Sequence, residues 1–335
     1  MGMGLREVKA GRSRAQYGAY LLILLGLFAP SKAFAYCRLT TCDETPLPKG
    51  CKPVVAGTCA TSGIPLFWPD RCLGFAVQQN GSPKLNVSWQ EADQLWANAF
   101  KPWLAARCGG GTPSVEMFDM DAIAGPIVCD EPQANVYAPN ANVLFFRDDD
   151  WPYPNTPGGV VIAQTTVTAN LDNGEIIDAD IEVNSFDPRN ASGFRDGSLD
   201  LRSVLTHESG HFLGLGHSMF PGSTMSPDYD SGPGETFGAL SSDDVAGICA
   251  VYPTDRNAPA CSSPETTNGF SRYCGDDATA KAALGLSGND AKGCSCRTAA
   301  SPANPGGRGL LAASSVIGIF GALRRARRRM EKKSP

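Results

Sequence analysis

Apolar residues recur at helical spacing over one stretch of the N-terminal half. Ser88 and Glu91 have the spacing of a capping box, and a stripe of apolar residues follows on one helical face: Trp89, Ala92, Trp96, Ala99, Phe100 and Trp103. We expect a long helix that packs across a sheet, with its aromatic stripe in the core. Beyond it, short β-rich runs at 142–146, 160–168 and 176–184 predict strands, so the pattern indicates an α+β fold.

In the C-terminal half of the chain, the pattern of apolar and polar residues predicts two further helices. Residues 185–198 are rich in Asn, Asp, Gly and Ser, which is typical of a loop. Asp200 is then expected to cap a helix that buries Leu201, Val204 and Leu205 on one side. After a Gly/Asp-rich loop, Ser241 and Asp244 are expected to cap the last helix.

All three histidines of the chain lie in the segment HESGHFLGLGH, from His207 to His217. Positions i and i+4 of a helix share one face, so His207 and His211 can both direct a nitrogen at one metal ion, with Glu208 alongside. Gly214 is expected to end the helix, and the turn can then bring His217 back as a third ligand. Three protein ligands leave a position for water, which Zn²⁺ acidifies towards a pKa of about 7 and which Glu208 would deprotonate.

This extended motif resembles the metzincin zinc peptidases, whose sequences also carry a methionine turn that Met225 would supply here. Ser218 and the segments 227–229 and 240–252 are similar to the matrixins among them. The resemblance implies a twisted mixed sheet, a long packing helix, an active-site helix, the methionine turn and a C-terminal helix. It further implies that Met225 forms an apolar floor under the zinc and that Pro227 and Tyr229 wall the substrate pocket. In that family, bound substrate pairs with an exposed strand edge, and residues 179–183 are similar to a strand common in bacterial matrixins.

The two ends of the chain indicate export. Residues 1–35 have basic residues, an apolar run and a final Ala-Phe-Ala, as a secretory signal peptide does. Near the other end, the apolar stretch 309–323 precedes five arginines within six residues, which resembles the MYXO-CTERM sorting tag of bacteria. Such a stretch would hold the chain in the membrane transiently, or permanently if it is a plain anchor. We therefore expect a protein at the bacterial cell surface or released from it.

Cysteine content and composition divide the chain further. Twelve cysteines, all outside the leader, favour disulfides in an exported protein, although a thiolate metal site is conceivable. Cys72 lies in a segment that superficially resembles the latency motif of vertebrate matrixins, so latency through its thiol is a hypothesis beside a disulfide. The expected organisation is a leader, a Cys/Pro-rich segment, a catalytic domain, a Cys-containing linker and a tail: 1–35, 36–64, 65–253, 254–296 and 297–335.

The charge of the central part restricts its partners. Residues 36–296 carry 15 basic and 32 acidic residues, a net charge of −17, which disfavours nucleic acid. Acidic clusters at 148–150 and at Asp178 and Asp180 offer the oxygen ligands that Ca²⁺ prefers, although an acidic loop is often only solvated. Besides catalytic zinc, a structural calcium ion is thus expected as a possible cofactor.

These observations predict a secreted or surface-displayed zinc endopeptidase that acts on proteins or peptides as a monomer. The metal would polarise the scissile carbonyl, and Glu208 would take a proton from water and deliver it to the leaving amine. A second hypothesis is a non-catalytic surface adhesion or binding module on a metzincin scaffold. A third, hydrolysis of cell-wall peptides, differs only in substrate, and nothing in the sequence distinguishes it.

Overall fold

The structure is a computed structural model of the chain. It describes residues 35–43, 47–55, 57–129, 131–135, 139–154, 160–227, 239–258, 261, 270–272 and 312–321. The chain divides into two units, Met1–Phe34 and Ala35–Pro335, and every described residue lies in the second. Residues 1–34 of the expected leader and the arginine-rich end therefore lie outside the described residues.

A mixed sheet forms the centre of the second unit, and its strands run in the order β3-β2-β4-β6-β5-β8. The first four strands in that order are parallel, and β5 is antiparallel to both β6 and β8. The bounds are β2 (Cys72–Val77), β3 (Glu116–Asp119), β4 (Val143–Phe146), β5 (Val160–Asn170), β6 (Ile176–Val183) and β8 (Ala312–Gly321). The strand segment expected to resemble bacterial matrixins lies in β6, which is an interior strand.

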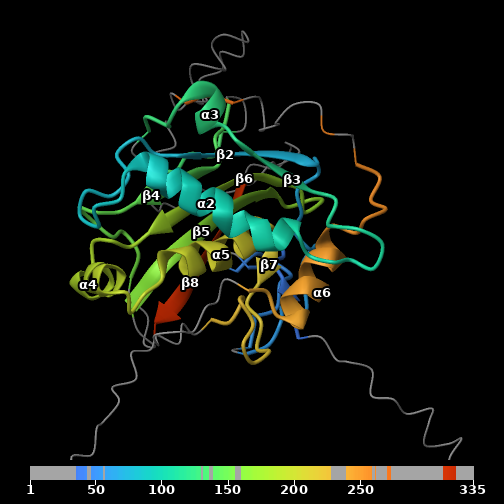
Figure 1. Cartoon of the computed structure of the whole chain (residues 1–335). Coiled ribbons are helices and arrows are strands. Elements are labelled where there is room, and N and C mark those ends of the chain that lie inside the picture. The colour runs from blue at the N-terminus through green and yellow to red at the C-terminus, as the bar shows by residue number, and fades with distance from the viewer. Residues whose placement is uncertain are drawn as a thin grey trace, which may run out of the picture. The chain divides into compact units, whose positions relative to one another are not determined.

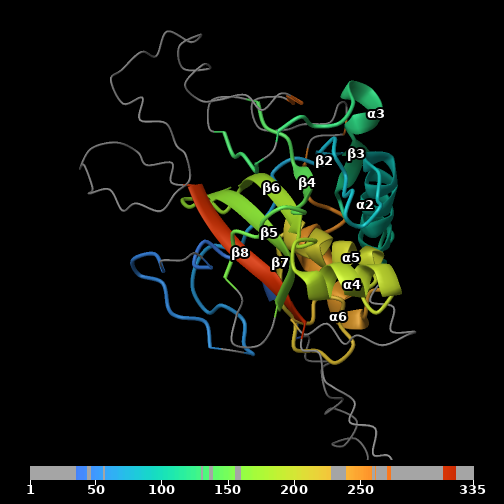
Figure 2. The same cartoon turned by 90° about the vertical axis from the view of Figure 1, so that its left-hand side faces the viewer.

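Two long helices, α2 (Trp89–Leu104) and α5 (Leu201–Phe212), lie together on one face of the sheet (Figures 1 and 2). The described residues also form the helices α3 (Asp121–Ala124), α4 (Pro188–Asp196) and α6 (Ser242–Val251). A separate two-stranded pair joins β1 (Cys37–Arg38) to β7 (Leu215–Gly216). Together the helices and the mixed sheet confirm the predicted α+β fold.

The aromatic stripe of α2 forms the centre of the core, as expected. Trp96, Phe100 and Trp103 are at most 1 % exposed, and the capping box of Ser88 and Glu91 starts the helix. Phe100 lies 5.3 Å from Phe212 of α5, measured between ring centroids, in an edge-to-face arrangement. The packing of these rings fixes α5 against α2.

Two tryptophan side chains also bind the backbone of α5. The indole N–H of Trp103 donates to the carbonyl of Thr206 at 2.9 Å. The indole N–H of Trp68 donates to the carbonyl of Phe212 at 2.8 Å, at the end of the helix. Because both indoles are buried, these bonds hold the helix that carries the histidines at two points along its length.

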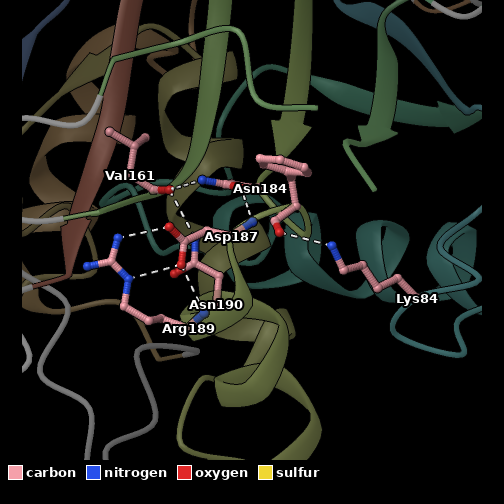
Figure 3. Close-up of polar contacts among 7 residues, drawn as sticks. Lys84, Val161, Asn184, Asp187, Arg189 and Asn190 are labelled. Carbon is pink, nitrogen blue, oxygen red and sulfur yellow. Dashed lines mark hydrogen bonds and ion pairs between the residues drawn. The ribbon is translucent and has the colours of Figure 1, made fainter. Parts of the chain in front are cut away.

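The prediction of a loop over 185–198 is wrong, because residues 188–196 form α4. Asp187 accepts the N–H of Arg189 as N-cap, Pro188 occupies the first turn, and Gly197 ends the helix with φ of 76°. Figure 3 shows how the helix is anchored: the side-chain amides of Asn184 and Asn190 both donate to the Val161 carbonyl of β5, at 2.7 and 3.1 Å. Residues that are typical of loops thus act here as helix caps and anchors.

Four disulfides lie among the described residues, in agreement with the predicted oxidised cysteines. Two bridges, Cys37–Cys59 and Cys42–Cys51, lie within the N-terminal segment. The bridges Cys72–Cys261 and Cys108–Cys249 join cysteines that are 189 and 141 positions apart in the sequence. The first of these contradicts the latency hypothesis, because the sulfur of Cys72 is in a disulfide and is not a free thiol for the metal.

Residues 312–321, part of the apolar stretch expected at a membrane, form the strand β8. It runs along β5 from the pair Asn170 and Ala312 to the pair Val160 and Gly321, and Figure 2 shows it at the outer edge of the sheet. Without β8, β5 would present an unpaired edge, and the Val, Ile and Phe residues of the stretch favour a strand. Within the described part of the chain, no helix combines the length and apolarity needed to cross a membrane.

Candidate functional site

The three histidines converge at the end of α5, as their spacing predicts. The Nε2 atom of His211 lies 3.0 Å from Nε2 of His207 and 3.2 Å from Nε2 of His217. His207 and His211 come from successive turns of one helix. All three Nε2 atoms therefore face one point that a single ion could occupy.

The chain reverses direction after α5 at Gly214, whose backbone conformation permits the turn. Asp200 caps the start of α5 with bonds to the N–H groups of Arg202 and Ser203, and Leu213 is the C-cap. Gly214 has φ of 89°, and a Cβ there would lie 2.8 Å from the Leu66 carbonyl oxygen. The short strand β7 follows and leads back to His217, as the sequence predicted.

The second nitrogen of two histidine rings is held by backbone carbonyls. Nδ1 of His207 lies 2.6 Å from the carbonyl oxygen of Thr224, and Nδ1 of His211 lies 2.8 Å from that of Leu215. A ring that donates through Nδ1 leaves the lone pair of Nε2 for a metal ion. Burial lowers the pKa of His207 to about 4 and that of His217 to about 3, so both rings are neutral at pH 7. Three neutral imidazoles are a donor set that fits zinc.

Glu208 follows the first histidine and is fully buried. Its Oε2 accepts a hydrogen bond of 2.5 Å from the hydroxyl of Thr165 on β5, while its Oε1 is buried without a partner. Burial raises the pKa of Glu208 to about 8, and the bond from Thr165 acts in the opposite direction. A carboxyl group with a pKa near neutrality can both accept and return a proton.

Met225 lies in the turn formed by residues 223–226 and packs against α5. It is 2 % exposed, and it packs so closely on α5 that a Cβ added to Gly210 would lie 2.2 Å from its Sδ. The residue before it, Thr224, is the one whose carbonyl holds His207. The turn therefore both supports and orients the cluster, and Gly210 is what permits its close approach.

Asp244 holds this turn from α6. Its carboxylate accepts the N–H groups of Thr224 and Met225, at 2.8 and 3.2 Å, and the hydroxyl of Ser223 at 2.5 Å. It also accepts the N–H of Ser241, which completes the predicted capping box. One buried carboxylate thus connects the start of α6 to the turn that carries Met225.

The remaining site residues expected from the sequence are only partly described. Pro227, expected in the substrate pocket, is half-buried directly after the turn, whereas Tyr229 lies outside the described residues. Of the expected calcium ligands, Asp148 accepts hydrogen bonds from Ser82, from the backbone N–H of Lys84 and from Ser185. Asp178 and Asp180 are buried side by side on β6, and burial, followed by their mutual proximity for Asp178, raises the pKa of each.

Comparison with known proteins shows that part of the chain is similar to the matrixins. Residues 128–253 match the matrixin family, peptidase family M10. Matrilysin of Rattus norvegicus is 47 % identical over 57 residues, 17 % of this chain and 21 % of that protein. Metalloendoproteinase 2-MMP of Arabidopsis thaliana is 40 % identical over 78 residues, 23 % of this chain and 20 % of that protein.

A third known protein is similar to part of this chain. Interstitial collagenase of Sus scrofa is 41 % identical over 80 residues, 24 % of this chain and 16 % of that protein. The chain therefore spans about a fifth of the length of the curated relatives that it matches. The part of the chain that carries the three histidines, Glu208 and Met225 is similar to the matrixins.

Proposed function

We propose that this protein is a zinc-dependent endopeptidase that hydrolyses internal peptide bonds of proteins. The observation that carries the proposal is the convergence of three Nε2 atoms beside a buried carboxyl group. His207, His211 and His217 would hold the zinc ion. When bound, zinc acidifies a water molecule and stabilises negative charge on the carbonyl oxygen of the substrate.

Glu208 performs the proton transfers in this proposal. Its carboxylate accepts a proton from the attacking water and afterwards donates it to the amine that leaves. Thr165 holds Oε2 through its hydroxyl, so the free Oε1 is the oxygen available for the proton. The low pKa values of His207 and His217 keep these rings neutral, so they stay competent as ligands while Glu208 changes its protonation state.

Pro227 and Tyr229 are proposed to wall the pocket for the substrate side chain, and Met225 to form the floor of the site. The matrixin similarity supports these roles, and the half-buried position of Pro227 directly after the turn is compatible with them.

We also propose calcium at Asp178 and Asp180, where Oδ1 of Asp178 is buried without a partner. The same role for residues 148–150 has less support, because Asp148 already accepts several hydrogen bonds.

Proteolysis that depends on zinc is the test of this function. The purified mature protein should cleave casein at internal bonds, lose that activity in 1,10-phenanthroline, and regain it when zinc is added back. The isomer 1,7-phenanthroline, which does not chelate, is the matched control and should have no effect. A zinc-loaded protein that leaves both casein and short peptides intact would instead support the adhesion or binding module, and cleavage confined to cell-wall peptides would support the third hypothesis.

We further propose that the chain is exported by a bacterium, with residues 1–35 as a cleaved leader and the C-terminal tail as a sorting tag. The leader and tag resemblances support this, as do the disulfides. In the structure, β8 covers the edge of β5, the strand whose Thr165 contacts Glu208. Removal of the tail near Cys294 and Cys296 would therefore also uncover this edge for a substrate strand. The intact mass of the mature protein should correspond to loss of both ends, and a mass that includes them would contradict the proposal.

A further inference from the structure

Three aspartates from three different elements lie close together at one place in the fold. They are Asp93 of α2, Asp119 at the end of β3 and Asp121 at the start of α3. One carboxylate oxygen of each lies within 4.8 Å of the others. Figure 2 shows α2, β3 and α3 next to one another. None of these aspartates belongs to the acidic segments in which the sequence suggested calcium.

Asp121 provides the observation that points to a bound cation. It is only 6 % exposed; its Oδ2 accepts the backbone N–H of Val77 at 3.0 Å, but its Oδ1 is buried with no hydrogen-bond partner. Oδ1 of Asp93 is likewise buried without a partner. A buried carboxylate oxygen that lacks a donor is costly, and native proteins rarely leave one so unless an ion or water binds it.

The charges around the three aspartates also point to a bound cation. Burial, and then the neighbouring Asp119, raise the pKa of Asp93 to about 6. Burial is also the main cause that raises the pKa of Asp121 to about 7, with further contributions from Asp93 and Asp119. Arg272 acts in the opposite direction on Asp121, while its Nη1 donates to the carbonyl of Ala124. One guanidinium group cannot offset three carboxylates, so the cluster needs protons or a cation.

We propose that Asp93, Asp119 and Asp121 bind a calcium ion. The donors are all hard oxygens, without histidine or cysteine, which favours calcium or magnesium over zinc. Calcium accepts flexible coordination by several carboxylates, whereas magnesium demands near-octahedral geometry and usually keeps several of its water ligands. Three carboxylates from three separate elements therefore suit calcium better than magnesium. Bound there, calcium would join α2 to the β3–α3 connection.

Calcium stoichiometry of matched variants tests this proposal. Asp93→Asn and Asp121→Asn keep the side-chain shape but remove a charge, and Asp172→Asn changes an exposed aspartate of the turn after β5 as the control. After dialysis against calcium, the zinc-loaded wild type and the control should hold one more calcium ion per chain than either variant, by mass spectrometry of the metal content. Equal calcium content in all four proteins would overturn the proposal. Calcium bound elsewhere is present in all of them and cancels.

The pH dependence of stability gives a second readout. In calcium-free protein, Asp93 and Asp121 hold protons in the folded state up to about pH 6 and 7, but in the unfolded state only to about pH 4. Their contribution to stability is therefore present at low pH and lost as the pH rises through 6 to 7. The rise in Tm on adding calcium should be larger at pH 8 than at pH 5, and this difference should shrink in Asp121→Asn.

The proposal stays testable if a variant does not fold. Crystals of the wild type grown with calcium should then show an anomalous difference peak between the three carboxylates, and its absence in calcium-saturated crystals would contradict the proposal. These readouts measure calcium and not peptide cleavage. They therefore succeed or fail independently of the proposed peptidase activity.

Discussion

Glu208→Gln is expected to lower kcat/KM for peptide hydrolysis by at least about 10²-fold, while the zinc content stays at the wild-type level. Glutamine has the shape of glutamate and its amide oxygen can still accept the hydroxyl of Thr165. It cannot accept a proton from water at neutral pH, because an amide is not a base in this range. The measurement is kcat/KM with a fluorogenic peptide, paired with zinc analysis of the same sample.

The control for this variant is Glu116→Gln, which changes a partly exposed glutamate in a surface ion pair with Arg71. Surface pairs of this kind contribute little, so its activity should equal that of the wild type. Normal turnover by Glu208→Gln would show that another group takes the proton. Loss of zinc from Glu208→Gln would instead show that the substitution disturbs the histidine ligands. Its activity would then not test whether Glu208 is the base.

Gly210→Ala is expected to destabilise the folded protein strongly. The loss should exceed that caused by adding a methyl group at any other position of α5. The new Cβ would lie 2.2 Å from Sδ of Met225 and 2.8 Å from Cζ2 of Trp103, both of which are buried. Since Thr224 precedes Met225 and its carbonyl holds His207, displacement of the turn should also weaken zinc binding. Overpacking of this kind costs about 3 kcal/mol, which lowers Tm by roughly 6 to 12 °C for a domain of this size.

Calorimetry of the zinc-free protein and a zinc-binding titration measure the two effects separately. Gly110→Ala is the matched control, because a Cβ there meets only Oγ1 of Thr254, at 3.8 Å, and Gly110 is not among the glycines of positive φ. Its Tm and zinc affinity should stay at wild-type values. Wild-type stability in Gly210→Ala would mean that Met225 does not pack on α5 as the structure has it.

Local pattern was sufficient to predict three strands of the sheet and the helices α2, α5 and α6, but not β2 or β8. The stripe from Trp89 to Trp103 predicted α2, and the runs at 142–146, 160–168 and 176–184 correspond to β4, β5 and β6. The helix α4 was not predicted, because Asn, Asp and Ser favour loops until caps and anchors from other segments engage them. For α4 the anchor is the Val161 carbonyl, which is 23 and 29 residues away from Asn184 and Asn190.

The site shows the same division between local and tertiary information. Helical spacing and one glycine turn are enough to bring the three histidines together, so the sequence contains that geometry. Thr165 and Asp244 were not predicted as parts of the site, since they reach it from strands and helices 43 and 20 residues away in the chain. Gly210 carried a signal that could have been used: a glycine inside a helix lowers its stability and often marks a close approach.

The central claim is that His207, His211 and His217 hold a zinc ion at which a coordination position remains for water. X-ray absorption at the zinc edge, on the purified chain, tests it most directly. The account predicts one zinc ion per chain at this site, with three imidazole nitrogens and oxygen in its first coordination sphere. Metal-free protein, or a zinc ion closed by four protein ligands without oxygen, would contradict it.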